Sequence, residues 1–259
     1  MALLMAAQAV NMGLLRKGGA LQGITEKKEW EHLGYDIIAG DFLSQSVAAG
    51  KSVTIERRRE AKVHPIDRED FPLARETGRL LEVITVESTK DMVSRVVAGI
   101  EDDCKKELKP EDIMVVALAG HGAAKPIDLA AALRRRGVAS HVADGNEFRK
   151  PEHVTVSGTF RAKGNEGWKV YACGLHLGGE PFVVATDEEL RRRNEVYVAL
   201  TRSRVWCVGL GLEGAIMDEL AAVVRQGSRL TFAAFNRSSL RRTIESETDR
   251  QEHVVERAA

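Results

Sequence analysis

The chain has 259 residues, with 38 lysines and arginines balanced by 38 aspartates and glutamates, so its formal net charge is zero. This length and an apolar content of 44% suit one large domain or two small ones with a substantial core. The net charge argues neither for nor against a nucleic-acid partner, and any basic surface must be local.

The three cysteines, Cys104, Cys173 and Cys207, lie far apart, and none belongs to a C-x-x-C pair or stands with a paired histidine. This spacing is typical of a reducing compartment and excludes a disulfide framework or a zinc site. We therefore predict no metal site of this kind and expect a cytoplasmic protein.

The first fifteen residues are apolar and end in Arg16 and Lys17. A secretory signal carries its positive charge before the apolar run, and this run is also too short to cross a bilayer. Its leucines and alanines recur at helical spacing, which predicts a helix that faces the core and no contact with a membrane. Residues 52–56 then alternate as a strand does, while 58–76 are charged and serve as a connection.

A regular alternation of strands and helices begins near residue 80. Strands that alternate with helices predict an α/β fold with a mostly parallel sheet and helices on both faces. The apolar run 113–118 is typical of a parallel strand buried on both faces. The predicted strands are 81–86, 113–118, 138–142, 154–157, 168–173, 205–210 and 229–232, and the predicted helices are 88–104, 127–136, 187–200 and 214–224.

We predict three parts in this chain. Residues 1–75 form an N-terminal helical and linking region, 76–235 form the α/β domain, and 236–259 form a polar tail that is helical or frayed. No internal repeat is present.

Two glycines and a glutamate follow the strand 154–157, and they are the first candidate site. Gly158 and Gly164 at such a junction let the backbone approach a ligand, and Glu166 follows them closely. An ordinary tight turn is equally compatible with the glycines, and Lys163 with Glu166 is compatible with a surface ion pair.

Arg202 follows directly after the predicted helix 187–200 and precedes the next strand. An arginine there compensates the helix dipole or forms a surface pair, or it stabilises charge on a phosphoryl group that is being transferred. Of the three arginine triplets, 57–59, 134–136 and 191–193, the last is the one we expect nearest to phosphate.

Ser157, Thr159 and Phe160 are candidates for nucleic-acid contact. The two hydroxyls and the local backbone suit phosphate oxygens, and Phe160 offers a base a stacking face unless it belongs to the core.

The string Val154-Thr-Val-Ser-Gly-Thr-Phe-Arg-Ala-Lys-Gly-Asn-Glu166, followed by Tyr197-Val-Ala-Leu-Thr-Arg202, resembles motifs V and VI of UvrD/Rep-like superfamily I DNA helicases. The resemblance implies the second, C-terminal RecA-like domain of such a helicase, with ATP as the nucleotide. By this resemblance Glu166 contacts the ribose, Gly164 gives it room, and Lys163 supports the turn or lies near phosphate. Arg202 is the arginine finger, and Arg204 is a weaker companion.

Parts of the family pattern are missing. No G-x-x-x-x-G-K-[ST] loop occurs, so the phosphate loop and the Mg²⁺ ligands would come from a first RecA-like half, in cis or in trans. The arginine that relatives carry after the strand 113–118 is replaced by Lys125 at best, with His121 as a loop histidine. Gly158 and Phe160 stand where many relatives have a T-x-H sequence.

The sequence therefore predicts half of an ATP-dependent helicase that shares an ATP site and contributes to a single-stranded DNA track, and that has no ATPase activity alone. The alternative is a non-catalytic α/β module, a truncated helicase remnant that binds nucleic acid or protein. For the helicase reading we expect Arg202 to project into solvent and to share a face with Gly164 and Glu166 at the carboxyl ends of the strands.

Overall fold

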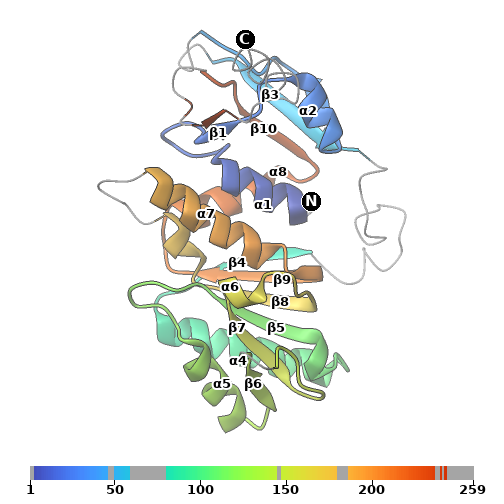
Figure 1. The fold of residues 1–259 in the computed structure, drawn as a ribbon, viewed down its shortest axis with the longest axis vertical. Coiled ribbons are helices and arrows are strands. Elements are labelled where there is room, and N and C mark those ends of the chain that lie inside the picture. The colour runs from blue at the N-terminus through green and yellow to red at the C-terminus, as the bar shows by residue number, and fades with distance from the viewer. Residues whose placement is uncertain are drawn as a thin grey trace, which may run out of the picture.

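A computed structural model describes residues 3–45, 50–58, 80–144, 147–179, 186–236, 240 and 242–243. The larger sheet has six strands. Figure 1 shows a layer of helices beside this sheet and a smaller sheet on the far side of those helices. Among the described helices none is long and apolar enough to cross a membrane.

The larger sheet is wholly parallel, with the strand order β4-β9-β8-β5-β7-β6. Its strands and helices alternate along the chain, so the predicted fold class, α/β with a mostly parallel sheet and helices on both faces, is confirmed. The strands are β4 Leu81–Thr85, β5 Ile113–Ala117, β6 Ser140–Val142, β7 Val154–Gly158, β8 Gly167–Cys173 and β9 Ser203–Gly211.

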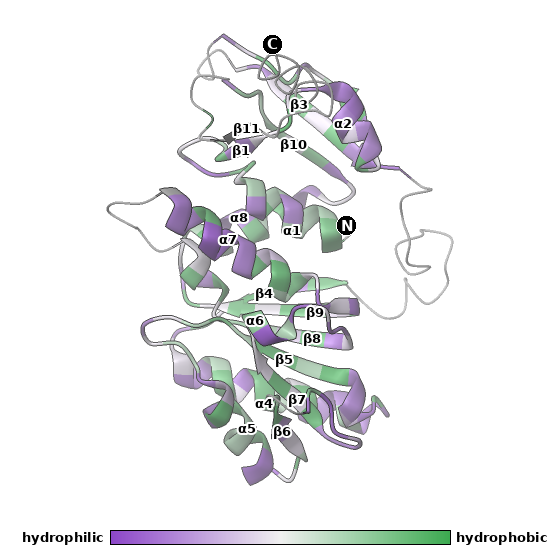
Figure 2. Ribbon diagram, in the orientation of Figure 1, coloured by the Kyte–Doolittle hydropathy of each residue, from purple (hydrophilic) through white to green (hydrophobic). Residues whose placement is uncertain are grey.

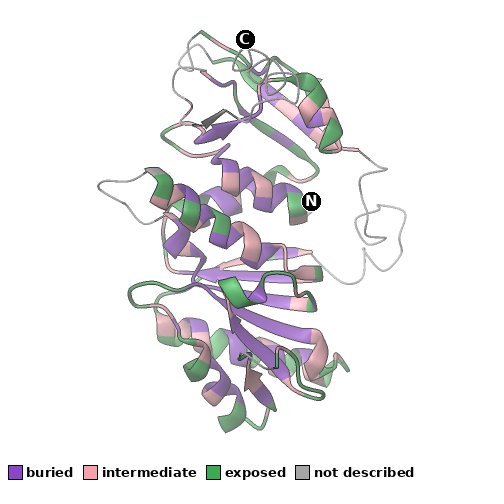
Figure 3. Ribbon diagram, viewed as in Figure 1, coloured by how far each residue is buried: buried purple, intermediate pink, exposed green. Residues whose placement is uncertain are grey.

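Strand β5 shows why the sheet needs two helical layers. All five of its residues are buried. Because successive side chains point to opposite faces, Ile113 and Val115 pack with one set of helices while Met114 and Val116 pack with the other. The first set is α4 Thr89–Lys105 and α5 Pro126–Arg135, and the second is α7 Thr186–Leu200 and α8 Ala215–Gln226. Figure 2 shows β5 as apolar over most of its length, and Figure 3 shows it as buried.

Local sequence signals set the ends of the helices. Ser88 caps α4 by accepting a hydrogen bond from the Asp91 backbone N–H at 3.1 Å, as the predicted capping pair requires. Pro126 opens α5 at its first turn. Gly227 ends α8 with a φ of 74°, a left-handed conformation that glycine adopts without strain. The short elements η3 Pro110–Asp112, α6 Thr159–Ala162 and η4 Leu175–Gly179 connect these helices and strands.

The smaller sheet joins segments from both ends of the chain. Strand β3 Ser52–Arg57 lies between β2 Tyr35–Ala39 and β10 Arg229–Ala233, antiparallel to both, and β1 Gln22–Gly23 pairs with β11 Arg242–Thr243. The predicted division at residue 75 stays a prediction, but β10, from the second predicted part, completes a sheet of the first.

An aromatic cluster forms the core of this smaller unit, together with the helix α2 Lys27–His32. Trp30 stacks on Phe42 with ring centroids 5.4 Å apart, and its indole N–H donates to the Ile24 carbonyl at 2.8 Å. Tyr35, Phe232 and Phe235 complete the cluster. These rings belong to one continuous hydrophobic core with residues of α1 and of the larger sheet, although residues 20 to 45 show little regular structure in their sequence alone.

The helix α1 Leu3–Met12 lies against α7 and α8, between the two sheets. Alanines on this helix allow close packing, and Ala6, Ala7 and Ala9 are buried. The predicted core-facing helix at the start of the chain is therefore confirmed, with its buried face on the α/β domain.

Candidate functional site

Glu166 and Arg202, one from each helicase-like motif, meet at the amino ends of β8 and β9. Glu166 directly precedes β8, Arg202 directly precedes β9, and the Gly167 backbone N–H donates to the Arg202 carbonyl at 2.9 Å. The expectation that Arg202, Gly164 and Glu166 share one face is confirmed. The expected face, at the carboxyl ends of the strands, is wrong, because both motif residues come before their strands and all strands of this sheet are parallel.

Arg202 is half-buried just after α7, so the expectation that it projects into open solvent is wrong. Its Nε donates to the Val198 carbonyl at 3.0 Å, and its Nη2 donates to Thr201 Oγ1 at 3.1 Å. Among the described residues no carboxylate forms an ion pair with it, in particular not Glu195. The guanidinium therefore caps a helix carbonyl and keeps part of its donor capacity.

Glu166 lies next to a second arginine. Arg204 Nε is 3.2 Å from Glu166 Oε2, and the two side chains are about half exposed. The Arg204 guanidinium also lies over the Trp168 ring, 6.0 Å from its centroid. An exposed pair of this kind contributes about 1 kcal/mol or less, so Glu166 exchanges this partner at little cost.

Gly164 has a φ of 86°, which a residue with a side chain adopts only with strain. A Cβ at this position would meet nothing within 4 Å, so the backbone conformation and not crowding requires glycine. Lys163 beside it is exposed. The turn brings Glu166 to the start of β8.

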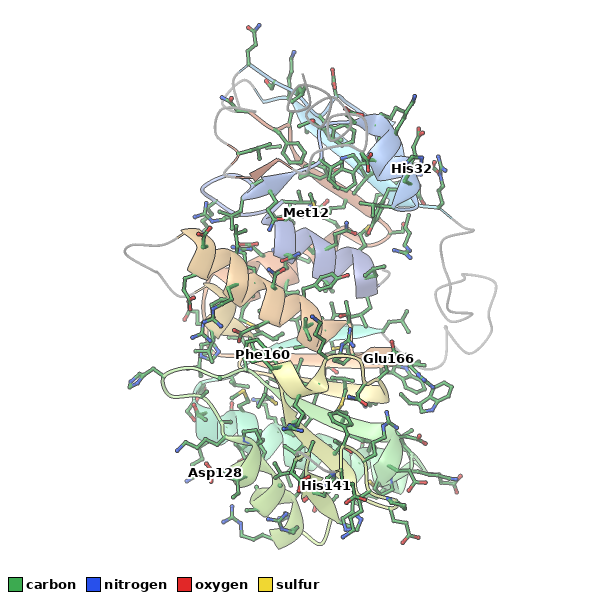
Figure 4. All side chains as sticks on the ribbon, viewed as in Figure 1. Met12, His32, Asp128, His141, Phe160 and Glu166 are labelled. Atoms are coloured by element: carbon green, nitrogen blue, oxygen red, sulfur yellow. The ribbon has the colours of Figure 1, made fainter. Side chains whose placement is uncertain are left out.

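The predicted nucleic-acid residues lie at the opposite edge of the sheet, where β7 ends (Figure 4). Phe160 is 73% exposed, so the alternative that it belongs to the core is wrong. Ser157 and Thr159 are buried, and their hydroxyls donate to the carbonyls of Gly158 at 3.0 Å and Ala117 at 3.4 Å. Phe160 is thus the side chain of this group that solvent reaches.

A cavity of about 270 Å³ opens beside Phe160, above the carboxyl ends of β5, β6 and β7. Most of its wall is apolar and built from small side chains. Its lining residues are Ala117, Ala119, Pro126, Val142, Ala143, Gly158, Thr159, Phe160, Arg161 and Glu195. The sequence gives no direct signal of this cavity, because its wall comes from five separate segments.

Glu195 is the acidic residue of this wall, and it is only 4% exposed. Its Oε1 accepts from Arg191 Nη1 at 2.5 Å, and its Oε2 lies 3.5 Å from Arg192 Nη1. Arg192 Nη1 also donates to the carbonyl of Ala119, a second residue of the wall, at 2.5 Å. The Glu195 carboxylate therefore lies close to the cavity. The sequence signal for this cluster is the spacing of Arg191 and Arg192, four and three residues before Glu195 on one helix.

The arginine triplet 191–193 pairs with carboxylates, and its expected proximity to phosphate stays a prediction. Arg193 is 1% exposed and forms a two-pronged pair with Glu219 at 2.8 and 2.9 Å. Its Nη1 also donates to the Val10 carbonyl of α1 at 2.6 Å. Arg16, just after α1, pairs with Glu189 at 3.0 Å. These contacts fix α1 to α7 and α8.

Gly50-Lys51-Ser52 matches the last three positions of a phosphate loop, without the glycine that such a loop has five residues before Gly50. A phosphate loop connects a strand to a helix, whereas here Ser52 begins strand β3. The Lys51 carbonyl accepts from the Ala234 N–H at 3.1 Å, which places this segment in the smaller sheet. It is not a phosphate loop.

The buried titratable groups have structural roles. Burial raises the pKa of the Cys173 thiol to about 12, and burial with the nearby Cys173 raises the pKa of Cys207 as well. Asp103 accepts hydrogen bonds from Lys169 and Tyr171, both at 2.5 Å. In the described ranges no three His, Cys, Asp or Glu side chains are grouped so that they could hold a metal ion.

Fold and site together define an α/β protein with a wholly parallel six-stranded sheet and candidate site residues at both ends of its strands. No family model and no curated protein matches the chain. One similar solved structure is the C-terminal domain of a possible DNA helicase from Lactobacillus plantarum WCFS1, with 17% sequence identity. The match covers 56% of this chain and 83% of that chain, with a TM-score of 0.43. A similarity at this level assigns no family.

Proposed function

We propose that this chain is the second RecA-like domain of a UvrD/Rep-like superfamily I DNA helicase. In this proposal it contributes Arg202 and Glu166 to an ATP site that another RecA-like half completes, and it forms part of a single-stranded DNA track. The observation that carries the proposal is the position of Arg202: it lies beside Glu166, on an open edge, without a carboxylate partner among the described residues.

Arg202 has the chemistry that an arginine finger needs. Its contacts with Val198 and Thr201 use two of the five N–H donors of a guanidinium, which leaves three for phosphate oxygens. The same two contacts fix the orientation of the group before a phosphate arrives. A planar, permanently charged group held in this way stabilises the charge that develops on a transferring phosphoryl group.

Glu166 would accept hydrogen bonds from ribose hydroxyls once it leaves Arg204. Arg204 would then keep its position over Trp168 or turn toward the phosphates. Mg²⁺ and the β- and γ-phosphates would be held by the other half, because this chain has no phosphate loop.

The single-stranded DNA track would run along the opposite edge, over Phe160. An exposed aromatic ring gives successive bases a stacking face, and stacking contributes about 1–3 kcal/mol per base. This arrangement separates the nucleotide from the nucleic acid by the length of the strands, so that closure on ATP at one edge changes the track at the other.

A second candidate is the non-catalytic α/β module that binds nucleic acid or protein. Two contacts favour it: Arg202 caps the end of α7, and Glu166 already pairs with Arg204, so both residues also have structural roles. Phe160 and the neighbouring cavity need no ATP to bind a ligand.

The test is complementation with a purified first RecA-like half of a UvrD-like helicase, added in trans or fused to this chain. We expect ATP hydrolysis that single-stranded DNA stimulates, and Arg202→Ala should lower it roughly 10³-fold. Arg202→Lys should restore little of the rate, because an ammonium group does not reproduce the fork geometry.

Arg225→Ala is the matched control, since Arg225 is an exposed arginine in the last turn of another helix, α8. It should leave the rate unchanged. Full activity of Arg202→Ala would refute the finger assignment. A folded complex without any ATP hydrolysis would favour the non-catalytic module.

A further inference from the structure

We propose that the cavity at the carboxyl edge takes a single nucleobase of the bound strand, and that Glu195 makes guanine the preferred base. The inference rests on the proposed function, because it adds base selection to the single-stranded DNA track. The proposal has three parts: the size of the cavity, the rim at Phe160, and the buried carboxylate.

The volume limits the ligand to one ring system. About 270 Å³ is slightly below the range of about 300–1,000 Å³ in which drug-sized ligands bind. The alanines, Pro126 and Val142 of the wall suit the apolar faces of a flat ring, and the polar side chains of the wall are Thr159, Arg161 and Glu195. The exposed ring of Phe160 at the rim is placed to stack on the base or its neighbour.

The Glu195 carboxylate determines which chemical groups of a ligand the cavity can bind. A buried carboxylate accepts hydrogen bonds only, and it repels phosphate. Each Glu195 oxygen accepts one contact, Oε1 from Arg191 at 2.5 Å and Oε2 from Arg192 at 3.5 Å. A carboxylate has about four lone-pair sites, so each oxygen keeps capacity for one further donor. The ligand edge must therefore present N–H groups.

Guanine presents two adjacent donors, N1–H and the 2-amino group, on one edge. Adenine and cytosine present one amino group there, and thymine one ring N–H. A carboxylate that accepts two parallel N–H bonds from one base discriminates by about 1–3 kcal/mol, so guanine should bind roughly tenfold more tightly than its competitors.

The experiment uses oligothymidylates that carry one central dG, dI, dA or dC, with fluorescence anisotropy as the readout. Inosine lacks only the 2-amino group of guanine, so the ratio of dG to dI affinity reports that contact. We expect roughly tenfold tighter binding of the dG strand by the unchanged protein.

Glu195→Gln should reduce the dG to dI ratio to below about twofold, because the amide has only one acceptor oxygen. Glu188→Gln is the matched control. Glu188 pairs with the same two arginines, Arg191 at 2.5–2.7 Å and Arg192 at 3.2 Å, but it does not line the cavity. The ratio of dG to dI affinity should stay at its original value in the Glu188→Gln variant.

Gly158→Val tests the cavity itself. Gly158 has extended backbone, with φ −79° and ψ 161°, and a Cβ there meets nothing within 4 Å, so the new side chain enters open space without strain. This variant should lose the preference for dG while it still binds a strand with an abasic centre. Equal affinity for dG and dI strands, or a preference that survives Glu195→Gln, would overturn the proposal.

Failure of the proposed function gives a different result. If no oligonucleotide binds, the DNA track is refuted, and titration with dGMP and dIMP then tests the cavity alone through the NMR methyl signals of Ala117 and Ala143. Shifts with dGMP alone would support the base site without the helicase. Shifts with neither nucleotide would refute the base site too.

Discussion

Arg193 shows at the scale of one residue how much of this fold depends on a buried charge. Its guanidinium satisfies a carboxylate of α8, a carboxylate of its own helix and a carbonyl of α1. Removing one partner of such a pair leaves an uncompensated charge in the core, whereas replacing both by apolar groups does not.

We expect Glu219→Gln to lower the free energy of unfolding by about 3–5 kcal/mol. The double variant Arg193→Met with Glu219→Leu should lose clearly less, because Glu189 keeps its ion pair with Arg16 and no unpaired buried charge remains. Urea denaturation followed by far-UV circular dichroism measures both. A double variant that is no more stable than the single one would show that the packing of these side chains matters more than their charges.

The residue scale also shows where prediction from sequence succeeded and where it failed. The motif strings place Arg202 and Glu166 side by side correctly, because both precede neighbouring strands. The motif strings alone do not show at which end of the strands these residues lie. That end follows only when the position of each residue is compared with the first residue of its strand. Arg193 looks like its neighbours Arg191 and Arg192 in sequence, and only the packing of α1 and α8 separates them.

At the scale of elements, the turn before β8 depends on one backbone conformation. Gly164 takes a φ of 86° in open space, so alanine there costs strain of about 1 kcal/mol without any clash. We expect Gly164→Ala to lose about this much stability in urea denaturation and to lower the complemented ATPase activity, because the turn delivers Glu166.

Gly122→Ala provides the matched comparison, since Gly122 has a φ of 70° and is also free of neighbours within 4 Å. It should cost similar stability and leave ATP hydrolysis unchanged. An equal loss of hydrolysis in both variants would contradict a specific role for the turn.

The strands and helices of the α/β domain could be predicted because each carries its own periodicity. The strand predicted at 113–118 is β5, observed at Ile113–Ala117, and the helix predicted at 187–200 is α7, observed at Thr186–Leu200. The strands predicted at 52–56 and 229–232 are β3 and β10 of the smaller sheet, but their pairing could not be predicted in this way. The central strand β3 pairs with β10, more than 170 residues away, and no local pattern encodes such a partner.

At the scale of the whole molecule, four buried acids make the fold sensitive to alkali. Burial raises the pKa of Tyr35 to about 12 and of Cys173 to about 12, and it also raises the pKa values of Cys207 and Tyr171. Unfolding exposes these groups to water, where thiols lose their protons near pH 9 and phenols near pH 10.

The unfolded state then binds fewer protons than the folded one, so stability falls as the pH rises. The free energy of unfolding should keep its full value below pH 9. It should begin to fall above pH 9 as the thiols of the unfolded chain ionise, and fall more steeply above pH 10 as the phenols ionise. Replacing Cys173 and Cys207 by alanine should move the onset toward pH 10. Urea midpoints measured from pH 7 to pH 11 provide the test, and an unchanged onset in the double variant would contradict it.

The pairing of β3 with β10 also has a consequence for the order in which the molecule is made. Strand β3 leaves the ribosome with β2 at one side, but its other neighbour lies more than 170 residues further along the chain. At a synthesis rate of about 5–20 residues per second, that edge waits roughly ten to thirty seconds for its partner. During this time the exposed backbone of β3 can pair with strands of other nascent chains. Aggregation of this protein therefore depends more on the period of its synthesis than on the stability of the finished fold.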